Sequence, residues 1–472
     1  MTTLPLPESY TGHSTLPPAG NMVTAWFHKL FASSLSARIK LVHALLLALL
    51  VVACAFRVWM IVRYNPMESL TSDPGRHWGF GTRPLDTQPF AAIDPIGYHV
   101  YLGVIAKFTV HSPILVAYWT ALLSLITPWL WYRFLRELFP DRTWALTGWV
   151  ILAALPSWSI IYSFFMQETL MLPLLGAALW ATWRCRRKRT TASFVVATGV
   201  WLLAGLTRGI CIPLAAVAMT WVWFEQGRKL EKAVIGLALL VGVLGPLAGR
   251  SWSIARVISP HGIGTLSQLY LQAGTSHLQF EFSRRGGTQQ WEYEFTSPSV
   301  MHPPFVPLSD WRSRREGTVR FSIDLDHGTR DWKAARDRLP EWDLGRAAWL
   351  TSESLILLFF SASWPDTDFS RPEGVLNFWL RWIWAPLTLL CAVVTIATWR
   401  RQREKLLPSL LLTWFIVQGL LPIAIGEGRY RKPFEGLLIC QCLLLATVIR
   451  GRHAATGSGV ASQRLAQAIQ PQ

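Results

Sequence analysis

Residues 41–62 read LVHALLLALLVVACAFRVWMIV, an apolar stretch in which Arg57 alone carries a permanent charge. A bilayer core about 30 Å thick takes about twenty residues of α-helix, so this stretch predicts a membrane-spanning helix. The residues before it are polar and contain prolines, without a short apolar segment followed by a cleavage site. We therefore expect the first span to act as an uncleaved anchor.

The composition of the whole chain agrees with a membrane protein. Of 472 residues, 51% are hydrophobic and only 15% are charged, which excludes a disordered chain and disfavours a soluble enzyme. The 26 tryptophans are typical of rings that lie at bilayer interfaces or stack on the faces of sugars. The net charge of +17 is spread in short clusters between apolar runs, so it indicates membrane topology and contact with anionic lipids and excludes a nucleic-acid partner.

About ten apolar stretches qualify as spans. They lie near 41–62, 113–131, 143–162, 169–183, 192–207, 210–224, 233–249, 376–399, 406–425 and 433–449. The expected fold is therefore an all-α polytopic membrane protein of about ten transmembrane helices, with a small extracytoplasmic insert domain.

Basic clusters set the orientation of these spans. They precede the first span and follow the second, fourth, sixth, eighth and tenth, for example Arg184–Arg189 and Arg400–Lys405. The positive-inside rule makes that side cytoplasmic, so both termini are expected there. Heavy use of arginine and the lack of a retention tail favour a bacterial inner (plasma) membrane.

This topology divides the chain into parts. Residues 1–40 and 450–472 form cytoplasmic tails, 41–249 a first transmembrane module and 376–449 the last helices. Three segments face the opposite side, namely a first loop at 63–112, an insert at 250–375 and a turn at 426–432. Within the insert, the apolar stretch 347–364 carries Glu353 and is expected to lie in or dip into the interface.

The first outer loop contains two Asp-Pro pairs, in 72–78 (SDPGRHW) and 94–99 (DPIGYH). Either Asp73 or Asp94 could simply cap a short helix, because Asp followed by Pro suits a helix start. Alternatively, one of them accepts a proton from a substrate hydroxyl. Arg76 and His77 would then orient it or hold an anionic group.

Two further ionisable residues interrupt apolar sequence. Glu168 ends the outer hairpin at 156–168 and opens the fourth span, where capping or a functional role is possible. Arg208 interrupts the junction of the fifth and sixth spans. Ionisable groups at such positions are costly, so they are functional candidates unless they snorkel or form structural ion pairs.

The last outer turn, 426–433, reads GEGRYRKP and holds Arg429, Arg431 and Lys432. Three cations are unexpected on this side of a membrane. Arginine offers donors matched to phosphate oxygens and lysine adds a point charge, which indicates phosphate binding. The alternatives are lipid headgroups or an ion pair with Glu427.

Other chemistry is poorly supported. Acidic pairs at 324–327 (DLDH) and 366–368 (DTD) could hold a hard cation, but such patterns are common in solvated loops. A divalent cation is possible but not favoured, and no cofactor or metal ligand set is expected. No glycine-rich nucleotide loop is present.

These features resemble the GT-C superfamily of integral-membrane glycosyltransferases, which includes protein O-mannosyltransferases and aminoarabinose transferases. The likeness rests on Asp73 after the first span, on the segment from Asp94 to Tyr98, on the hairpin ending at Glu168 and on the turn from Arg429 to Pro433. It follows the order of elements over most of the chain, but the insert at 250–375 matches no part of the pattern. Pro74 stands where many relatives carry a second acid, which leaves open which aspartate is the base.

The resemblance implies transfer of a sugar from a polyprenyl-phosphate carrier to an acceptor hydroxyl on the outer face, usually with inversion. The acceptor is a lipid, a glycan, a polyol or a protein. In this hypothesis Asp73 or Asp94 is the base and Glu168 orients the acceptor or an arginine. The cations Arg429, Arg431 and Lys432, with Arg208, bind the donor phosphate. The expected substrate contacts are Arg76, His77, Trp78, Tyr98 and Tyr430.

Two rival functions remain from the sequence. A glycan polymerase or ligase also combines many spans with a large outer loop, and it would use insert residues such as Arg284, Arg285 or His302. A transporter of lipid-linked substrates is disfavoured because the spans show no internal repeat.

Overall fold

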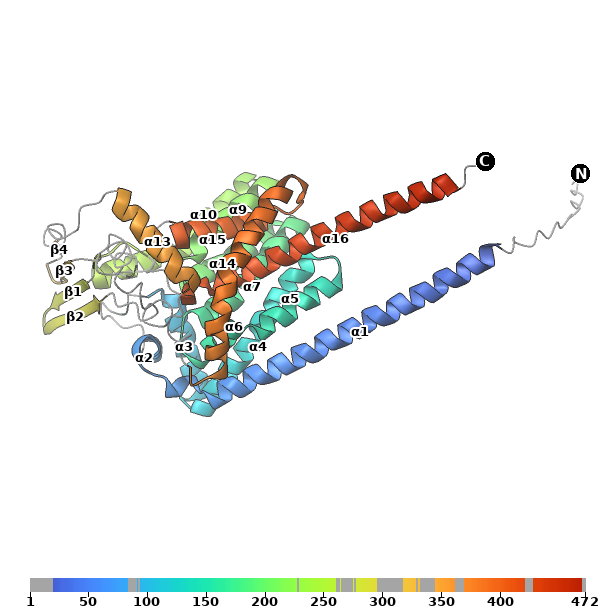
Figure 1. Cartoon of the computed structure of the whole chain (residues 1–472). Helices are drawn as coiled ribbons and strands as arrows, with labels where there is room; N and C mark the ends of the chain where they lie inside the picture. The colour runs from blue at the N-terminus through green and yellow to red at the C-terminus, as the bar shows by residue number, and fades with distance from the viewer. Residues whose placement is uncertain are drawn as a thin grey trace, which may run out of the picture.

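The computed structural model describes residues 20–83, 94–226, 229–259, 277–294, 317–327, 344–360, 369–420 and 428–468, together with Ala91, Gly264, Thr275 and 330–331. This part of the chain is mainly helical, with fourteen α-helices and one small β-sheet (Figure 1). The helices α1 (Gly20–Arg63) and α16 (Lys432–Ala468) project from one end of the molecule, and the sheet lies at the other. We call these the terminal end and the sheet end.

Within the described residues, five segments are long and apolar enough to cross a membrane. They are Ile39–Glu68, Pro113–Leu138, Lys229–Ala255, Pro372–Arg401 and Gly428–Arg450. They include most of α1, α4 (Pro113–Leu138), α10 (Lys229–Ala255), α14 (Pro372–Thr398) with η6 (Trp399–Arg401), and the first half of α16. The prediction of a mainly helical protein with apolar helices long enough to span a membrane is confirmed.

A sixth candidate span is bent. The helix α5 (Arg142–Ala154) is followed by α6 (Pro156–Ile160) and η3 (Ile161–Ser163), and the two parts meet at 59°. Pro156 lacks a backbone N–H and disfavours a helical conformation at Leu155, so the break follows from the sequence.

The remaining predicted stretches also fall on helices. These are α7 (Glu168–Lys188), α8 (Thr191–Thr207), α9 (Cys211–Glu225), and α15 (Leu406–Phe415) with η7 (Ile416–Leu420). Positions 421–425 of the ninth predicted stretch lie outside the described residues. By length, α8, α9 and the α15–η7 segment are short apolar helices.

Tryptophans fill the core where the helices meet. Trp131 of α4 donates to the carbonyl of Leu172 at 2.9 Å, and Trp158 of α6 donates to the carbonyl of Lys432 at 3.0 Å. Gly436 of α16 lies against both rings, and an added Cβ there would come within 2.6 Å of Trp131. The last helix is thereby packed tightly against α4 and α6.

The insert contains a four-stranded sheet of order β2-β1-β3-β4. The strands are β1 (His277–Arg284), β2 (Gly287–Glu294), β3 (Thr318–Asp324) and β4 (Arg330–Asp331). The central pair, β1 and β3, is parallel, and the outer pairs are antiparallel. Leu278, Phe280 and Phe282 alternate with more exposed residues along β1, so one face of the sheet is buried.

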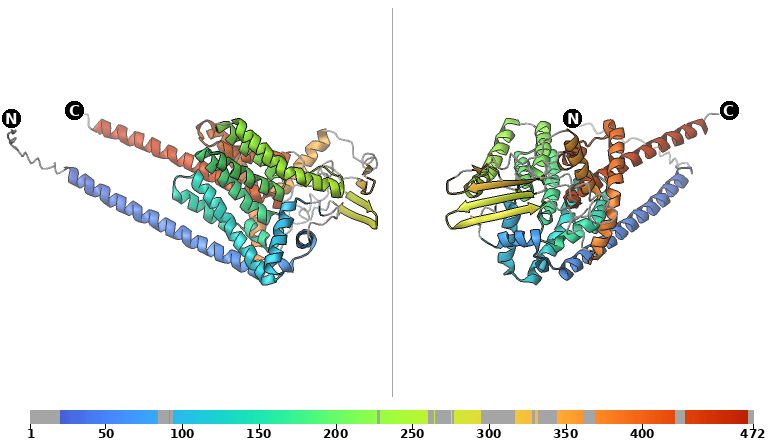
Figure 2. Two further views of the ribbon diagram at one scale, coloured as in Figure 1. Left: turned by 180° about the vertical axis from the view of Figure 1, so that it is seen from behind. Right: turned by 60° about the vertical axis from the view of Figure 1, so that its left-hand side comes forward.

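The stretch expected at the interface forms α13 (Leu344–Phe360), which packs against α14, η7 and η8 (Gly428–Arg431). The first loop forms η1 (Pro66–Glu68), α2 (Ser72–Thr82) and α3 (Ile96–Thr109). Both α2 and α3 lie toward the sheet end (Figures 1 and 2).

Candidate functional site: an ionic network at the sheet end

Two glycines bring α2 and α3 into close contact. An added Cβ at Gly81 would lie 2.5 Å from the Cβ of Leu102, and one at Gly103 would lie 2.6 Å from the carbonyl oxygen of Gly81. Gly81 follows His77 by one helical turn, and Gly103 follows His99 by one turn. The close approach of the two helices therefore also brings His77 and His99 together.

Asp73 joins the first loop to η8, the turn before α16. Its Oδ2 accepts a hydrogen bond from Arg429 Nη1 at 2.9 Å, across 356 positions of sequence. Its Oδ1 lies 3.1 Å from Arg76 Nη1, one turn later on α2. Asp73 is thus held between two guanidinium groups.

Asp94 lies on the other side of Arg76. Arg76 Nε donates to its Oδ2 at 3.0 Å, and Gln167 Nε2 donates to its Oδ1 at 3.0 Å. The ring nitrogens His77 Nδ1 and His99 Nε2 lie 3.6 and 3.8 Å from Asp94 Oδ2. Asp94 therefore connects α2, α3 and the start of α7.

A second ion pair adjoins the same region. Arg208 Nη1 lies 2.5 Å from Glu168 Oε1, which is buried at the N-terminus of α7. The Arg208 guanidinium also lies 4.4 Å from the centre of the Tyr430 ring, and that of Arg429 lies 5.0 Å from it. Arg429 Nη2 donates to the Tyr430 hydroxyl at 3.1 Å. Tyr430 therefore links the two arginines.

We call this set the ionic network. Its members are Asp73, Arg76, Asp94, Glu168, Arg208, Arg429 and Tyr430. Three carboxylates face three guanidinium groups, so the set is balanced in formal charge. Two of the predicted catalytic carboxylates share Arg76 directly, and the third connects to them through Arg208, Tyr430 and Arg429.

The charged neighbours control ionisation in the network. Burial opposes the charged form of Asp73, but the attraction of Arg429 and Arg76 outweighs it and holds the pKa of Asp73 well below its usual range. The pKa of Asp94 is likewise lowered, because the attraction of Arg76 and the histidines outweighs burial. Burial lowers the pKa of His77 to about 4 and also lowers that of His99, so both imidazoles are neutral at pH 7.

The two other predicted phosphate ligands are placed differently. Arg431 is buried, and its Nε donates to Glu435 Oε1 at 2.9 Å. Its Nη1 donates to the carbonyls of Leu358 and Phe359, in the last turn of α13. Lys432 is fully buried as well. Arg431 is therefore used to join α16 to α13, and neither residue faces an open surface.

The aromatic candidates are also enclosed. Trp78 is 8% exposed and stacks on Phe165 with ring centres 4.6 Å apart. Tyr98 is 1% exposed, and its hydroxyl accepts a hydrogen bond from Thr169 at 3.2 Å. Both rings pack between α2, α3 and α7 and leave little surface for a sugar.

Two residues of the site were not predicted. His99 was within the quoted segment 94–99, and the recurrence of a histidine four or five residues after each aspartate could have indicated it. Gln167 gave no comparable indication, because an uncharged amide before Glu168 is unremarkable in sequence. Its role depends on where α3 meets α7.

The insert contributes fewer candidate site residues than the ionic network does. Asp324 Oδ1 accepts hydrogen bonds from the backbone N–H groups of Asp326 and His327, and its Oδ2 lies 2.7 Å from His327 Nδ1, so this acidic pair forms the turn after β3. Arg284 and Arg285 lie at the turn between β1 and β2. His302, Asp366, Asp368 and Glu427 lie outside the described residues.

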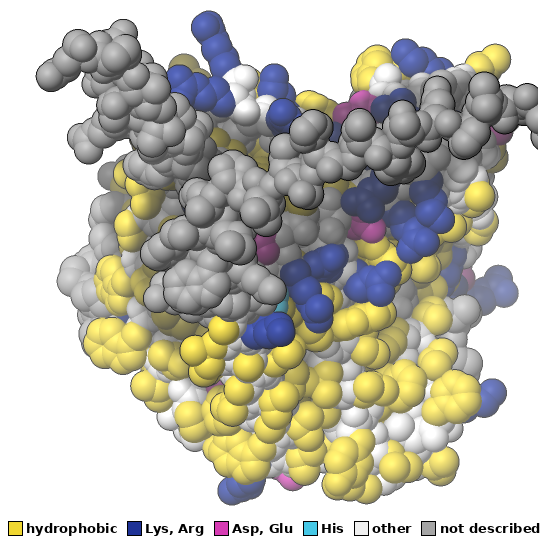
Figure 3. All heavy atoms as spheres, turned by 90° about the vertical axis from the view of Figure 1, so that its right-hand side faces the viewer, with side chains coloured by type: hydrophobic (Ala, Val, Ile, Leu, Met, Phe, Trp, Pro, Cys, Tyr) yellow, Lys and Arg dark blue, Asp and Glu magenta, His cyan; other side chains and the backbone are white. Residues whose placement is uncertain are grey.

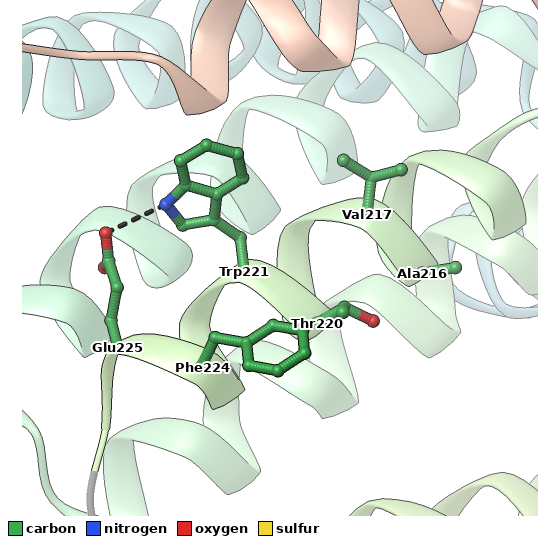
Figure 4. Close-up of a pocket in the computed structure, with 6 residues that line it drawn as sticks. All are labelled: Ala216, Val217, Thr220, Trp221, Phe224 and Glu225. Atoms are coloured by element: carbon green, nitrogen blue, oxygen red, sulfur yellow. Dashed lines mark hydrogen bonds between the residues drawn. The ribbon is translucent and has the colours of Figure 1, made fainter.

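A hollow of about 730 Å³ lies elsewhere, on one face of α9 (Figure 4). Its lining is mostly apolar and includes Val217, Trp221 and Phe224. The one carboxylate there, Glu225, accepts from Trp221 and pairs with Arg186 of α7. This hollow lacks the reactive groups that the ionic network has.

No protein-family model, curated protein or solved structure matches the chain. The geometry of the ionic network and the distribution of charge are therefore what indicates a function.

Proposed function

We propose that the protein is an integral-membrane glycosyltransferase, which transfers a sugar from a polyprenyl-phosphate carrier to an acceptor hydroxyl on the extracytoplasmic face. The observation that carries the proposal is the contact between Asp73 and Arg429. It joins the loop expected to hold the base to the turn expected to hold the donor phosphate. Transfer of a sugar away from a phosphate leaving group needs the base and the phosphate-binding residues within one site.

Topology supports an outer location for this site. Lys and Arg gather at the terminal end (Figure 3), for example in the last turn of α7 and in η6. By the positive-inside rule that end is cytoplasmic, and the ionic network lies outside. In this proposal the chain crosses a bacterial inner membrane about ten times, with both termini inside and the insert outside.

The donor phosphate would bind the arginines that keep some access to solvent. The side chains of Arg76, Arg208 and Arg429 are 28%, 16% and 15% exposed, against 1% for Arg431. Arginine has five N–H donors, so a guanidinium that holds a carboxylate by one edge can hold a phosphate by another. The carrier tail would remain in the bilayer beside the helices.

Asp73 is the better candidate for the base. Its side chain is 22% exposed, whereas that of Asp94 is 12% exposed and has more protein partners. With two arginines beside it, the Asp73 carboxylate is ionised but has a low proton affinity. A phosphate bound to Arg429 would offset one positive charge and raise that affinity, which suits a base acting only when the donor is present. Attack by the acceptor on the face opposite the phosphate would invert the anomeric centre.

The test measures movement of label from a polyprenyl-phosphate-linked radioactive sugar into other products, in membranes containing the wild-type protein or a variant. Asp73→Asn should reduce this transfer by about 100-fold or more, because a general base contributes about 10²–10⁴ in rate. Asp141→Asn is the matched control. Asp141 caps α5, and asparagine caps equally well.

Full transfer by Asp73→Asn would contradict the assignment of the base. Label that crosses the bilayer while still attached to its carrier would show that the protein is a transporter and not a transferase. Loss of transfer only on substitution of Arg284 or Arg285 would favour a polymerase or ligase centred on the insert.

A further inference from the structure

Three potential metal-ligating atoms meet inside the α2–α3 hairpin. His77 Nδ1 and His99 Nε2 are 3.2 Å apart, and they lie 3.6 and 3.8 Å from Asp94 Oδ2. Among the described residues, this is the group of His, Cys, Asp and Glu side chains that converges closely enough to hold a metal ion. His77 is 2% exposed, His99 is 6% exposed and the Asp94 side chain is 12% exposed, so the cluster has little contact with solvent.

The spacing suits a small transition-metal ion. Zinc binds histidine nitrogen and carboxylate oxygen at about 2.0–2.2 Å. In the plane of the three atoms, the point equally distant from them lies about 2.1 Å from each, so a metal bound at about 2.2 Å would lie slightly out of this plane, on the side of a fourth ligand. We propose that His77, Asp94 and His99 bind a divalent cation of the zinc class.

The ligand types select among cations. Two imidazole nitrogens and one carboxylate suit Zn²⁺ and the related ions Co²⁺ and Ni²⁺. Mg²⁺ and Ca²⁺ prefer oxygen ligands, so they bind this set poorly. Three protein ligands leave a fourth position for water or a substrate oxygen, as in zinc sites that take part in reactions.

The surroundings already orient the ligands. Gln167 and Arg76 hold the Asp94 carboxylate, and the glycine contact of Gly81 with Gly103 fixes the two histidines on adjacent helices. Loss of such supporting contacts typically weakens metal binding by about 10–100-fold. The positive charge of Arg76 beside the site favours an anionic oxygen, such as hydroxide or phosphate, as the fourth ligand.

Without metal, one imidazole donates a hydrogen bond to the other through the same two nitrogens. Binding requires the tautomers with protons on His77 Nε2 and His99 Nδ1, so that both facing nitrogens offer lone pairs. A metal therefore replaces one hydrogen bond with three bonds.

The test uses the full-length protein purified without a polyhistidine tag, stripped with a chelator and titrated with Zn²⁺ or Co²⁺. Elemental analysis should find about one zinc per chain, and Co²⁺ should give the intense visible absorption of a tetrahedral ion. His99→Gln should weaken Co²⁺ binding by more than about 100-fold, because it removes a direct ligand. His111→Gln is the matched control, since His111 lies at the start of the α3–α4 turn outside the cluster, and it should bind as wild type does.

Absence of zinc and of a cobalt spectrum in the folded wild type would overturn the proposal and leave only a histidine–histidine hydrogen bond. Equal Co²⁺ affinity in wild type and His99→Gln would overturn it as well. The proposal does not rest on the proposed function. Metal binding without sugar transfer would contradict the transferase alone, and transfer by a protein that binds no metal would contradict the metal site alone.

Discussion

Two arginines of η8 have different roles. Arg429 pairs with Asp73 and is partly exposed, whereas Arg431, two positions later, is buried against Glu435. Glu435 also accepts a hydrogen bond from Ser157 of α6. The sequence indicated three unexpected cations that needed anionic partners. For Arg429 and Arg431 those partners are carboxylates of the chain itself, so an unusual cation does not by itself require an anionic ligand.

This difference predicts that Arg431→Met is mainly a stability defect. The substitution leaves Glu435 buried without its cation, and breaking a buried ion pair costs about 3–5 kcal/mol. It also removes the donors to the last turn of α13. Thermal unfolding in detergent should therefore show a clearly lower midpoint than that of the wild type.

Arg429→Met provides the comparison. Its ion pair with Asp73 keeps some access to solvent, which reduces the cost of removing one partner, so the midpoint should fall less than that of Arg431→Met while donor affinity falls. A normal unfolding midpoint for Arg431→Met together with weakened donor binding would show that Arg431 binds the donor phosphate.

At the scale of elements, one buried arginine supports the bend between α5 and α6. Arg57 of α1 is fully buried and donates to the carbonyls of Leu152, Ala153 and Trp158 at 3.1, 2.5 and 3.1 Å. Pro156 ends α5 and leaves its last carbonyls without helical partners. Arg57 supplies the missing donors, which explains a charge within an otherwise apolar span.

We therefore expect Arg57→Met to destabilise the protein by about 3 kcal/mol or more, since each unsatisfied buried acceptor costs about 1–3 kcal/mol. Arg63→Met is the matched control on the same helix. Arg63 is exposed, so its loss should change stability by less than about 0.5 kcal/mol. Equal unfolding midpoints for the two variants would show that Arg57 does not support the bend.

The same elements show what sequence can and cannot predict. Apolar length located the helices, because about twenty residues of hydrophobic sequence have few other stable arrangements. The stretch 143–162 was predicted as one helix, although Pro156 marked the break. The partners of Arg57, Arg431 and Asp94 were not predictable, because each depends on which helices touch. Asp73 and Arg429 were both selected, but only the fold puts them 2.9 Å apart.

At the scale of the molecule, charge is distributed unequally between the two ends. The terminal end carries basic clusters such as Arg186, Arg187 and Lys188 in the last turn of α7. At the sheet end, the arginines of the ionic network are matched by carboxylates. The positive-inside rule counts Lys and Arg near the spans and gives little weight to Asp and Glu, so the basic clusters at the terminal end set the expected orientation.

The orientation predicts which end is accessible from outside the cell. In a variant with its six cysteines replaced, single cysteines are introduced by Val110→Cys, Arg285→Cys or Arg187→Cys. Val110 is 81% exposed at the end of α3, Arg285 is exposed on the sheet, and the Arg187 side chain is 65% exposed at the terminal end. A membrane-impermeant maleimide applied to right-side-out vesicles should label the first two and should label Arg187→Cys only after permeabilisation. The reverse labelling pattern would place the ionic network on the cytosolic side, against the positive-inside rule. A polyprenyl carrier could still reach it there, but the proposed reaction on the outer face would be wrong.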